Sequence, residues 1–177
     1  ELPETKNIEV VSPSGVCCSG MHALKYAFMS LKIGDKKKAV ATGSERVAIT
    51  MTSDKFEEEV QHMISLEENP YLAFEKDFLR WMLSDGAGAL LLESEKNPND
   101  ISLRIDWMEA CSFAHIMEPC MYMASDKTED GQLISYKDHD MQEIVDKSLL
   151  SIKQDVKILG KNIVELGNTL LLESLEK

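Results

Sequence analysis

The sequence predicts an α/β fold built in layers, and three patterns support this class. Two short stretches, Ala39–Ser44 and Ala89–Leu92, carry almost only apolar and small residues, which is typical of strands covered on both faces. Apolar side chains surround the predicted helix Cys18–Ile33 on nearly all sides, as expected for a buried helix. Turn residues separate these stretches. Strands and helices in this order are typical of layered α/β domains with a parallel sheet.

Length and composition favour a globular protein of a reducing compartment. The chain has 177 residues, of which 44% are hydrophobic, and this is enough to form a core. The formal net charge of −12 repels phosphate backbones and anionic lipids, so we expect no nucleic-acid partner. The sequence shows no apolar leader or membrane-length apolar span, and we expect no membrane insertion. Four cysteines make no disulfide framework at this length, which favours the cytoplasm.

The first part of the chain is expected to form a strand, a turn and a helix. Ile8–Val11 predicts a short strand, and Ser12–Gly15 predicts the turn that follows it. The helix Cys18–Ile33 comes next, and we expect Gly34 to end it as a C-cap. Lys36–Lys38 is predicted to be a solvated connection to the next strand.

The middle of the chain predicts two helices, a turn and a further strand. The helices are expected near Ser53–Leu66 and Leu72–Leu79. Asn97–Asp100 has the composition of a turn, and Ile101–Ala110 alternates apolar and polar residues as a strand does.

The last part of the chain predicts a hairpin and one long helix. Gly131 and Tyr136 mark the hairpin. The apolar periodicity of Met141–Leu159 predicts a single helix with Asp140 near its start and Gly160 as its C-cap.

A pair of cysteines lies where the first turn meets the first helix. Cys17 and Cys18 are followed by Ser19 and Gly20, and Gly15 precedes them. Unpaired backbone N–H groups and the positive end of the helix dipole stabilise a thiolate at such a position. Neither glycine carries a Cβ, so a ligand could approach the sulfur closely. The pattern indicates a candidate nucleophile, although a free cysteine is more often a core residue.

Three motifs, taken in order, resemble the ketoacyl synthase III branch of the thiolase-like condensing enzymes. They are Ser12–Leu24, Lys38–Glu45 with its Gly-Ser pair, and Leu83–Glu93. In that family the nucleophile cysteine begins a buried helix, and a Gly-Asp-Gly-Ala-Gly-Ala segment opens a later strand. Here Ser84–Ala89 reads Ser-Asp-Gly-Ala-Gly-Ala, one residue off the pattern. Cys18 matches the nucleophile because it directly precedes a small residue and a glycine, as in the family.

The resemblance implies a thiolase-like layered α/β/α fold of which this chain represents the middle. Residues 1–96 would be the second part of the N-terminal half, with the nucleophile helix and an insertion that covers the acyl pocket. Residues 97–177 would begin the C-terminal half and end before its His and Asn motifs.

The implied activity is that of an acyltransferase similar to 3-oxoacyl-ACP synthase III. An acyl thioester would pass its acyl group to Cys18. A Claisen-type condensation would then join that group to a carrier-bound acyl unit, in fatty acid or polyketide-like lipid biosynthesis. The sequence around Cys18 is most similar to enzymes that make dialkylresorcinol or aryl-polyene lipids. The resemblance further implies acyl-CoA and acyl carrier protein as partners, a homodimer, and no cofactor or metal.

Two parts of the family's catalytic constellation have no counterpart in this sequence. The family uses a histidine in a His-Gln-Ala-Asn setting and a later asparagine to stabilise enolate-like charge. Asn168 and the four histidines lack that setting, the histidines being His22, His62, His115 and His139. We therefore expect no complete condensation by this chain alone. The alternative function is a non-catalytic, condensing-enzyme-like partner subunit.

Other roles for the cysteines are less well supported by the sequence. A metal or redox role for Cys17 and Cys18 is the third alternative, but adjacent cysteines have poor geometry for either. Cys111, His115 and Cys120 match no zinc spacing, so we expect them in a core or pocket. Because strands covered on both faces need neighbours, we also expect this segment not to exist as a lone monomer.

Overall fold

The computed structural model describes residues 7–52 and 71–176. It divides the chain into two compact units. The first consists of residues 1–45 and 85–108, and the second of residues 46–84 and 109–177. Each unit is described by itself.

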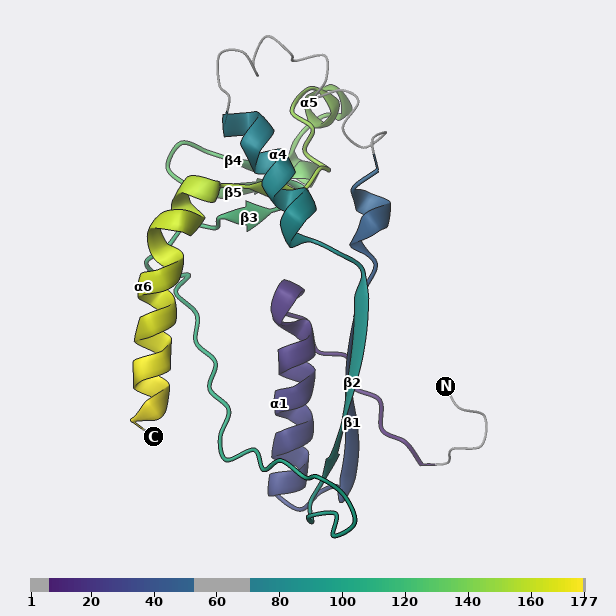
Figure 1. Cartoon of the computed structure of the whole chain (residues 1–177). Helices are drawn as coiled ribbons and strands as arrows, with labels where there is room; N and C mark the ends of the chain where they lie inside the picture. Colours follow the sequence, from purple (N-terminus) through teal and green to yellow (C-terminus); the bar gives the residue numbers. More distant parts are fainter. Residues whose placement is uncertain (1–6, 53–70, 177) are drawn as a thin grey trace. The chain divides into compact units, whose positions relative to one another are not determined.

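The first unit is a helix packed on a pair of long strands (Figure 1). A 3-10 turn, Val16–Cys18, leads into helix α1, Ser19–Lys32. Strands β1, Lys38–Glu45, and β2, Gly86–Glu93, pair antiparallel along their whole length. The parallel sheet expected from the sequence is therefore wrong for this pair. The end of β1 lies opposite the start of β2, so the chain returns at the edge where it left, which only an antiparallel pair allows.

Helix α1 ends as the sequence predicts. Gly34 has a φ of 80°, in the left-handed region that favours glycine. Its N–H donates to the carbonyl of Leu31 at 3.1 Å, and the N–H of Asp35 donates to the carbonyl of Ser30 at 3.0 Å. These bonds use carbonyls that the end of a helix leaves without intrahelical partners, and they confirm the C-cap.

Only one face of the strand pair is covered among the described residues. Ala27 of α1 and Ala41 and Leu92 of the strands form the buried cluster, against which Leu24, Phe28, Leu31, Ala39 and Ile105 pack. On the other face, Val40 and Leu91 lie opposite each other, each 63% exposed. The expectation of strands buried on both faces is thus wrong here, because a single helix covers a single face. Helix α1 is likewise only half covered, since Met21 and Met29 are exposed.

Two segments predicted as strands have no ladder in the structure. Residues 8–11 are extended and exposed, with Val10 at 76%. Residues 101–110 are also irregular, and Ile101 and Leu103 are almost fully exposed. Both have a strand-like residue pattern but no neighbouring strand among the described residues, and a strand forms only where it pairs. The turn before the second segment is confirmed, since Asn97 Oδ1 accepts the N–H of Asn99 at 3.0 Å.

The second unit combines short helices with two-residue and three-residue strands. Helix α4 is Tyr71–Met82, which confirms the helix expected at 72–79 and extends it. The helix predicted at 53–66 lies outside the described residues. The other elements are a 3-10 turn at Val47–Thr50, β3 Met121–Tyr122, β4 Ser125–Lys127, β5 Leu133–Ser135, a 3-10 turn at Tyr136–Asp138, α5 Met141–Asp146, β6 Lys153–Gln154 and α6 Val156–Leu175. Strand β3 pairs with β6, and β4 pairs with β5 in the predicted hairpin.

The single long helix predicted at 141–159 is in fact two helices. Asp140 caps α5 and forms a capping box with Glu143, so the predicted start is correct. Ser148 then takes a φ of 47°, which no helix tolerates, and Leu149 beyond it is completely buried. Asp155 caps the new helix α6, and Gly160 lies inside that helix rather than at an end.

The described elements confirm a mixed α/β fold with small antiparallel sheets. None of the helices in the described ranges is long and apolar enough to span a membrane.

Candidate functional site

The cysteine pair sits on the turn that opens helix α1. Cys17 and Cys18 both belong to the 3-10 turn, and Cys18 is also the N-cap residue of α1. Both are free and exposed, so the interpretation of this pair as buried core is wrong for the described structure. No acidic side chain lies in the first turn of α1, so none opposes negative charge on a sulfur there.

The backbone of this turn is strained and internally bonded. Val16 has a φ of 50°, which is unusual for a β-branched residue and is typical of functional turns. The N–H of Cys18 donates to the carbonyl of Gly15 at 2.9 Å. The hydroxyl of Ser19 donates to the carbonyl of Val16 at 2.8 Å. Because the Cys18 N–H is already used, it is not free to stabilise an oxyanion, as the sequence interpretation expected.

His22 holds the entrance to the turn from the first turn of α1. Its Nδ1 lies 3.2 Å from the carbonyl oxygen of Ser14. A carbonyl only accepts, so Nδ1 carries the hydrogen, and Nε2 of the neutral ring is left as an acceptor. The ring packs so closely on Gly15 that a Cβ there would lie 2.7 Å from Nδ1. Gly15 is thus needed for space, a role that the sequence interpretation did not identify.

A second pair of glycines brings α1 close to β1. A Cβ on Gly43 would lie 3.5 Å from the Cα of Gly20, so helix and strand are in contact without side chains between them. The packing role predicted for Gly20 is therefore confirmed. The same role predicted for Gly88 is wrong in the described structure, since a Cβ at that position would meet no atom within 4 Å.

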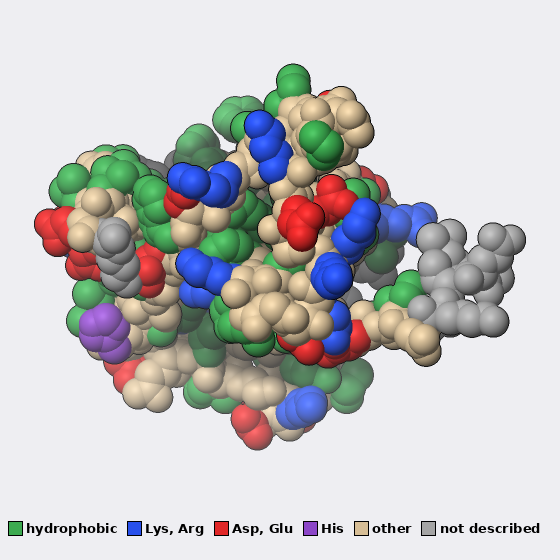
Figure 2. Space-filling view, turned by 90° about the horizontal axis from the view of Figure 1, so that it is seen from below, with side chains coloured by type: hydrophobic (Ala, Val, Ile, Leu, Met, Phe, Trp, Pro, Cys, Tyr) green, Lys and Arg blue, Asp and Glu red, His purple; other side chains and the backbone are tan. Residues whose placement is uncertain are grey.

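The lysine run after α1 is largely neutralised by nearby carboxylates. Lys36 pairs with Glu9 and Asp35, both at 2.9 Å, and Lys38 pairs with Glu93 at 2.6 Å. The hydrogen bonds to Glu9 from Lys36 and Tyr26 lower the pKa of that carboxyl. Figure 2 likewise shows acidic and basic side chains side by side on the face it presents. This run is therefore a weak candidate for docking an acidic carrier protein.

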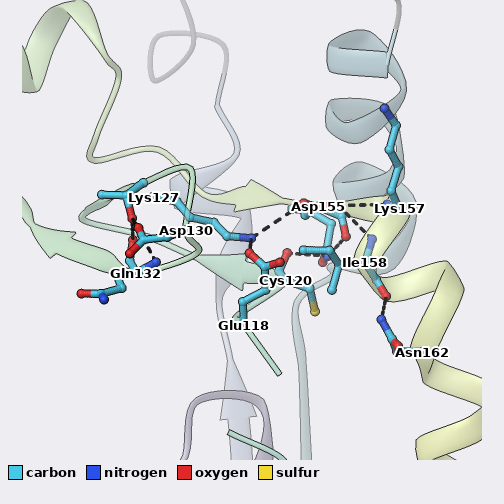
Figure 3. A network of polar contacts seen from close by, with 11 residues as sticks. Glu118, Cys120, Lys127, Asp130, Gln132, Asp155, Lys157, Ile158 and Asn162 are labelled. Carbon is cyan, nitrogen blue, oxygen red and sulfur yellow. Dashed lines mark hydrogen bonds and ion pairs between the residues drawn. The ribbon is translucent and has the colours of Figure 1, made fainter. Parts of the chain in front are cut away.

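A polar network in the second unit joins its strands to helix α6 (Figure 3). Lys127, whose side chain is 11% exposed, lies 2.7 Å from Glu118 and 3.8 Å from Asp155. Asp155 accepts the N–H groups of Lys157 and Ile158 at the start of α6. These charges satisfy one another and the helix end. The arrangement is that of a structural network, without a free group for chemistry.

The backbone of Cys120 belongs to the same network. Its carbonyl accepts the N–H of Asp155 at 2.6 Å and Nε2 of Gln154 at 2.7 Å. The side chain of Cys120 is half-buried and that of Cys111 is exposed. In the part of the chain that the structure describes, no three His, Cys, Asp or Glu side chains come together as a metal site would require.

His139 is the most enclosed histidine of the second unit. Its side chain is 9% exposed, with Nδ1 3.2 Å from Glu143 and Nε2 4.0 Å from Asp126. Lys147 donates to Asp126 at 2.6 Å and thereby lowers the pKa of that carboxyl. The cluster links α5 to β4. Since the ammonium of Lys147 already occupies the space beside Asp126, this cluster offers no cation site.

An open hollow of about 240 Å³ also lies in the second unit. It is lined by Val47, Ala48, Met51, Arg80, Leu83 and Ser84. Its lining combines apolar side chains with one guanidinium, and none of the cysteines contributes to it.

Comparison with known proteins places the cysteine turn and the strand pair together in one family. The family model described as "Beta-ketoacyl synthase, N-terminal domain" matches residues 9–97, which is half of the chain and includes the cysteine turn, α1, β1 and β2. No curated protein matches the sequence. The domain is that of condensing transferases. The chain therefore belongs to the beta-ketoacyl synthase family.

Proposed function

We propose that the protein is an acyltransferase of the ketoacyl synthase III type that carries its acyl group on Cys18. One observation carries the proposal: an exposed cysteine caps the helix that follows a strained turn, inside the segment that matches the family. In this proposal the chain has a thiolase-like layered fold. Residues 1–96 belong to its N-terminal half and residues 97–177 begin its C-terminal half.

The proposed chemistry has two steps. First, the Cys18 thiolate attacks the carbonyl of an acyl-CoA or acyl-carrier thioester, and the carrier thiol leaves. Second, a carbanion on a carrier-bound acyl unit attacks the carbonyl of the acyl-cysteine. A carbon–carbon bond forms and the cysteine thiolate is released. The second step needs groups that stabilise the enolate, and the family's His-Gln-Ala-Asn motif is absent from this sequence.

Cys17 is the second candidate for the nucleophile, because of the hydrogen bond made by Cys18. A nucleophile that also donates its own N–H to the oxyanion needs that N–H free. The N–H of Cys18 is bonded to Gly15, whereas the structure shows no such bond for Cys17 among the described residues. The strained Val16 also directly precedes Cys17.

Peptide mapping after incubation with acyl-CoA distinguishes the two cysteines. We expect the acyl group on Cys18, lost in Cys18→Ser and kept in Cys17→Ser. Cys111→Ser is the matched control, since Cys111 is equally exposed but lies outside the family segment. Acylation that disappears only in Cys17→Ser would move the assignment to Cys17. An adduct on Cys111 or Cys120, or no adduct, would contradict an acyl-transfer role.

The alternative is a non-catalytic partner subunit that keeps the fold and lacks the chemistry. The missing His-Gln-Ala-Asn motif is the observation that favours it. A partner subunit would bind its catalytic counterpart without forming an acyl-cysteine, so the same mapping experiment separates the two functions.

The remaining parts of the proposal follow from the resemblance. They are a cytoplasmic homodimer, a carrier protein as partner, lipid biosynthesis of the dialkylresorcinol or aryl-polyene kind, and no cofactor. The exposed apolar pair Val40 and Leu91 supports association, because an uncovered apolar face favours burial against a neighbour. Sedimentation checks it: a monomer with a sharp cooperative melt would contradict the dimer.

A further inference from the structure

The adjacent thiols of Cys17 and Cys18 are unable to close into a relaxed disulfide. Consecutive Cα atoms are about 3.8 Å apart, whereas disulfides join Cα atoms about 4.4 to 6.8 Å apart. A direct sulfur–sulfur bond would therefore be strained. Both cysteines are free and exposed on one 3-10 turn. The turn thus presents two thiols that persist side by side.

A bridging atom removes this geometric constraint. When a third atom stands between the two sulfurs, they no longer have to approach to bonding distance. Thiolates are soft ligands and select soft, thiophilic elements. Both thiols are open to a reagent from solvent, and no acidic side chain of the first turn of α1 competes for it.

We propose that Cys17 and Cys18 together form a dithiol site for trivalent arsenic compounds. In the reaction, each thiol gives up its proton and forms one sulfur–arsenic bond. The two oxygen ligands of the hydrated arsenical leave as two water molecules. Arsenic stays trivalent throughout, so the step needs neither oxidant nor reductant. The inference does not depend on acyl transfer, since it uses only the pair of thiols and their exposure.

The other two cysteines supply the internal control. Cys111 and Cys120 are nine residues apart in the sequence. Cys120 is half-buried and its backbone is fixed by the bonds to Asp155 and Gln154. Each of the two can form only a single sulfur–arsenic bond, which a competing monothiol displaces. The adjacent pair forms two bonds at once and resists that competition.

Binding of phenylarsine oxide in the presence of excess glutathione tests the site. We expect one arsenical per chain in the intact mass of the full protein, removed by 2,3-dimercaptopropanol. Cys17→Ser and Cys18→Ser should each lose it, and a Cys111→Ser/Cys120→Ser double variant should keep it. Retention by either single variant of the pair, or no retention by the wild type, would overturn the site.

A second measurement on the wild type guards against variants that misfold. The arsenical should protect both Cys17 and Cys18 from alkylation by iodoacetamide, while Cys111 is alkylated as before. Protection of only one of the pair would contradict a bridge. Failure of acyl transfer with an intact arsenical bridge would refute the proposed function alone.

Discussion

The substitution Gly15→Ala is expected to displace His22 from the turn that carries the thiols. A Cβ at this position would lie 2.7 Å from Nδ1 and 2.8 Å from Cε1 of His22, well inside van der Waals contact. The backbone itself is no obstacle, because the φ of 169° at Gly15 is extended and open to any residue. The imidazole must therefore move, and its bond to the Ser14 carbonyl is lost.

The expected magnitude follows from that lost bond. A single hydrogen bond contributes about 0.5 to 1.5 kcal/mol to stability. His22 is only half-buried, so its ring can swing into solvent, and crowding adds little. We expect the free energy of unfolding to fall by about 1 kcal/mol, measured by urea denaturation. We also expect slower acylation, because the turn before the thiols loses its anchor.

A double-mutant cycle with His22→Ala isolates the contact. Without the imidazole, a methyl group at residue 15 has space, so Gly15→Ala should cost almost nothing in the His22→Ala background. The coupling between the two positions is then about 1 kcal/mol. An equal cost of Gly15→Ala in both backgrounds would refute the reasoning, since the effect would then not pass through His22.

Three further predictions concern the second unit. Leu149→Ala should lower the free energy of unfolding by about 2 to 5 kcal/mol by leaving a cavity, since Leu149 is fully buried; a loss below 1 kcal/mol in urea denaturation would contradict that packing. Asp155→Ala should cost about 1 kcal/mol through loss of the cap of α6, visible as reduced helicity by circular dichroism, and an unchanged spectrum would argue against the cap. Lys147 lowers the pKa of Asp126, so the pair stabilises the fold above the unfolded pKa of the carboxyl and loses that effect as pH falls through the lower folded pKa. The stability difference between wild type and Lys147→Met should therefore be largest near neutral pH and vanish in acid, and a difference that does not change with pH would exclude the ion pair as its cause.

Features set by neighbouring residues could be predicted from the sequence. The end of α1 depends on Gly34, because that position needs a positive φ. The hairpin β4–β5 turns at Gly131 for the same reason, with a φ of 83°. Asp140 begins α5 because its side chain reaches the N–H of Glu143, only three residues away. Each of these signals acts over a few residues, so the chain need not be folded for them to be recognised.

The position of the cysteines was predictable for the same local reason. A turn followed by an apolar helix places Cys18 at a helix start, and the structure has it there as the N-cap. The role of Gly15 was not predictable, because it depends on where the ring of His22, seven residues later, packs. The commitment of the Cys18 N–H to Gly15 likewise depends on the strained φ of Val16, which no residue type in the turn announces.

Tertiary structure alone decided which apolar patterns became covered strands. Ala39–Ser44 and Ile101–Ala110 both read as strands, yet only the first pairs, because a ladder needs a partner brought from elsewhere in the chain. Likewise the apolar periodicity of Met141–Leu159 is continuous, but the backbone breaks at Ser148 and buries Leu149. The free energy gained by burying a side chain depends on what surrounds it, and residues distant in the sequence supply those surroundings. The sequence by itself thus determined the caps, the turns and the place of the thiols, while pairing, burial and the helix break were decided by long-range contacts.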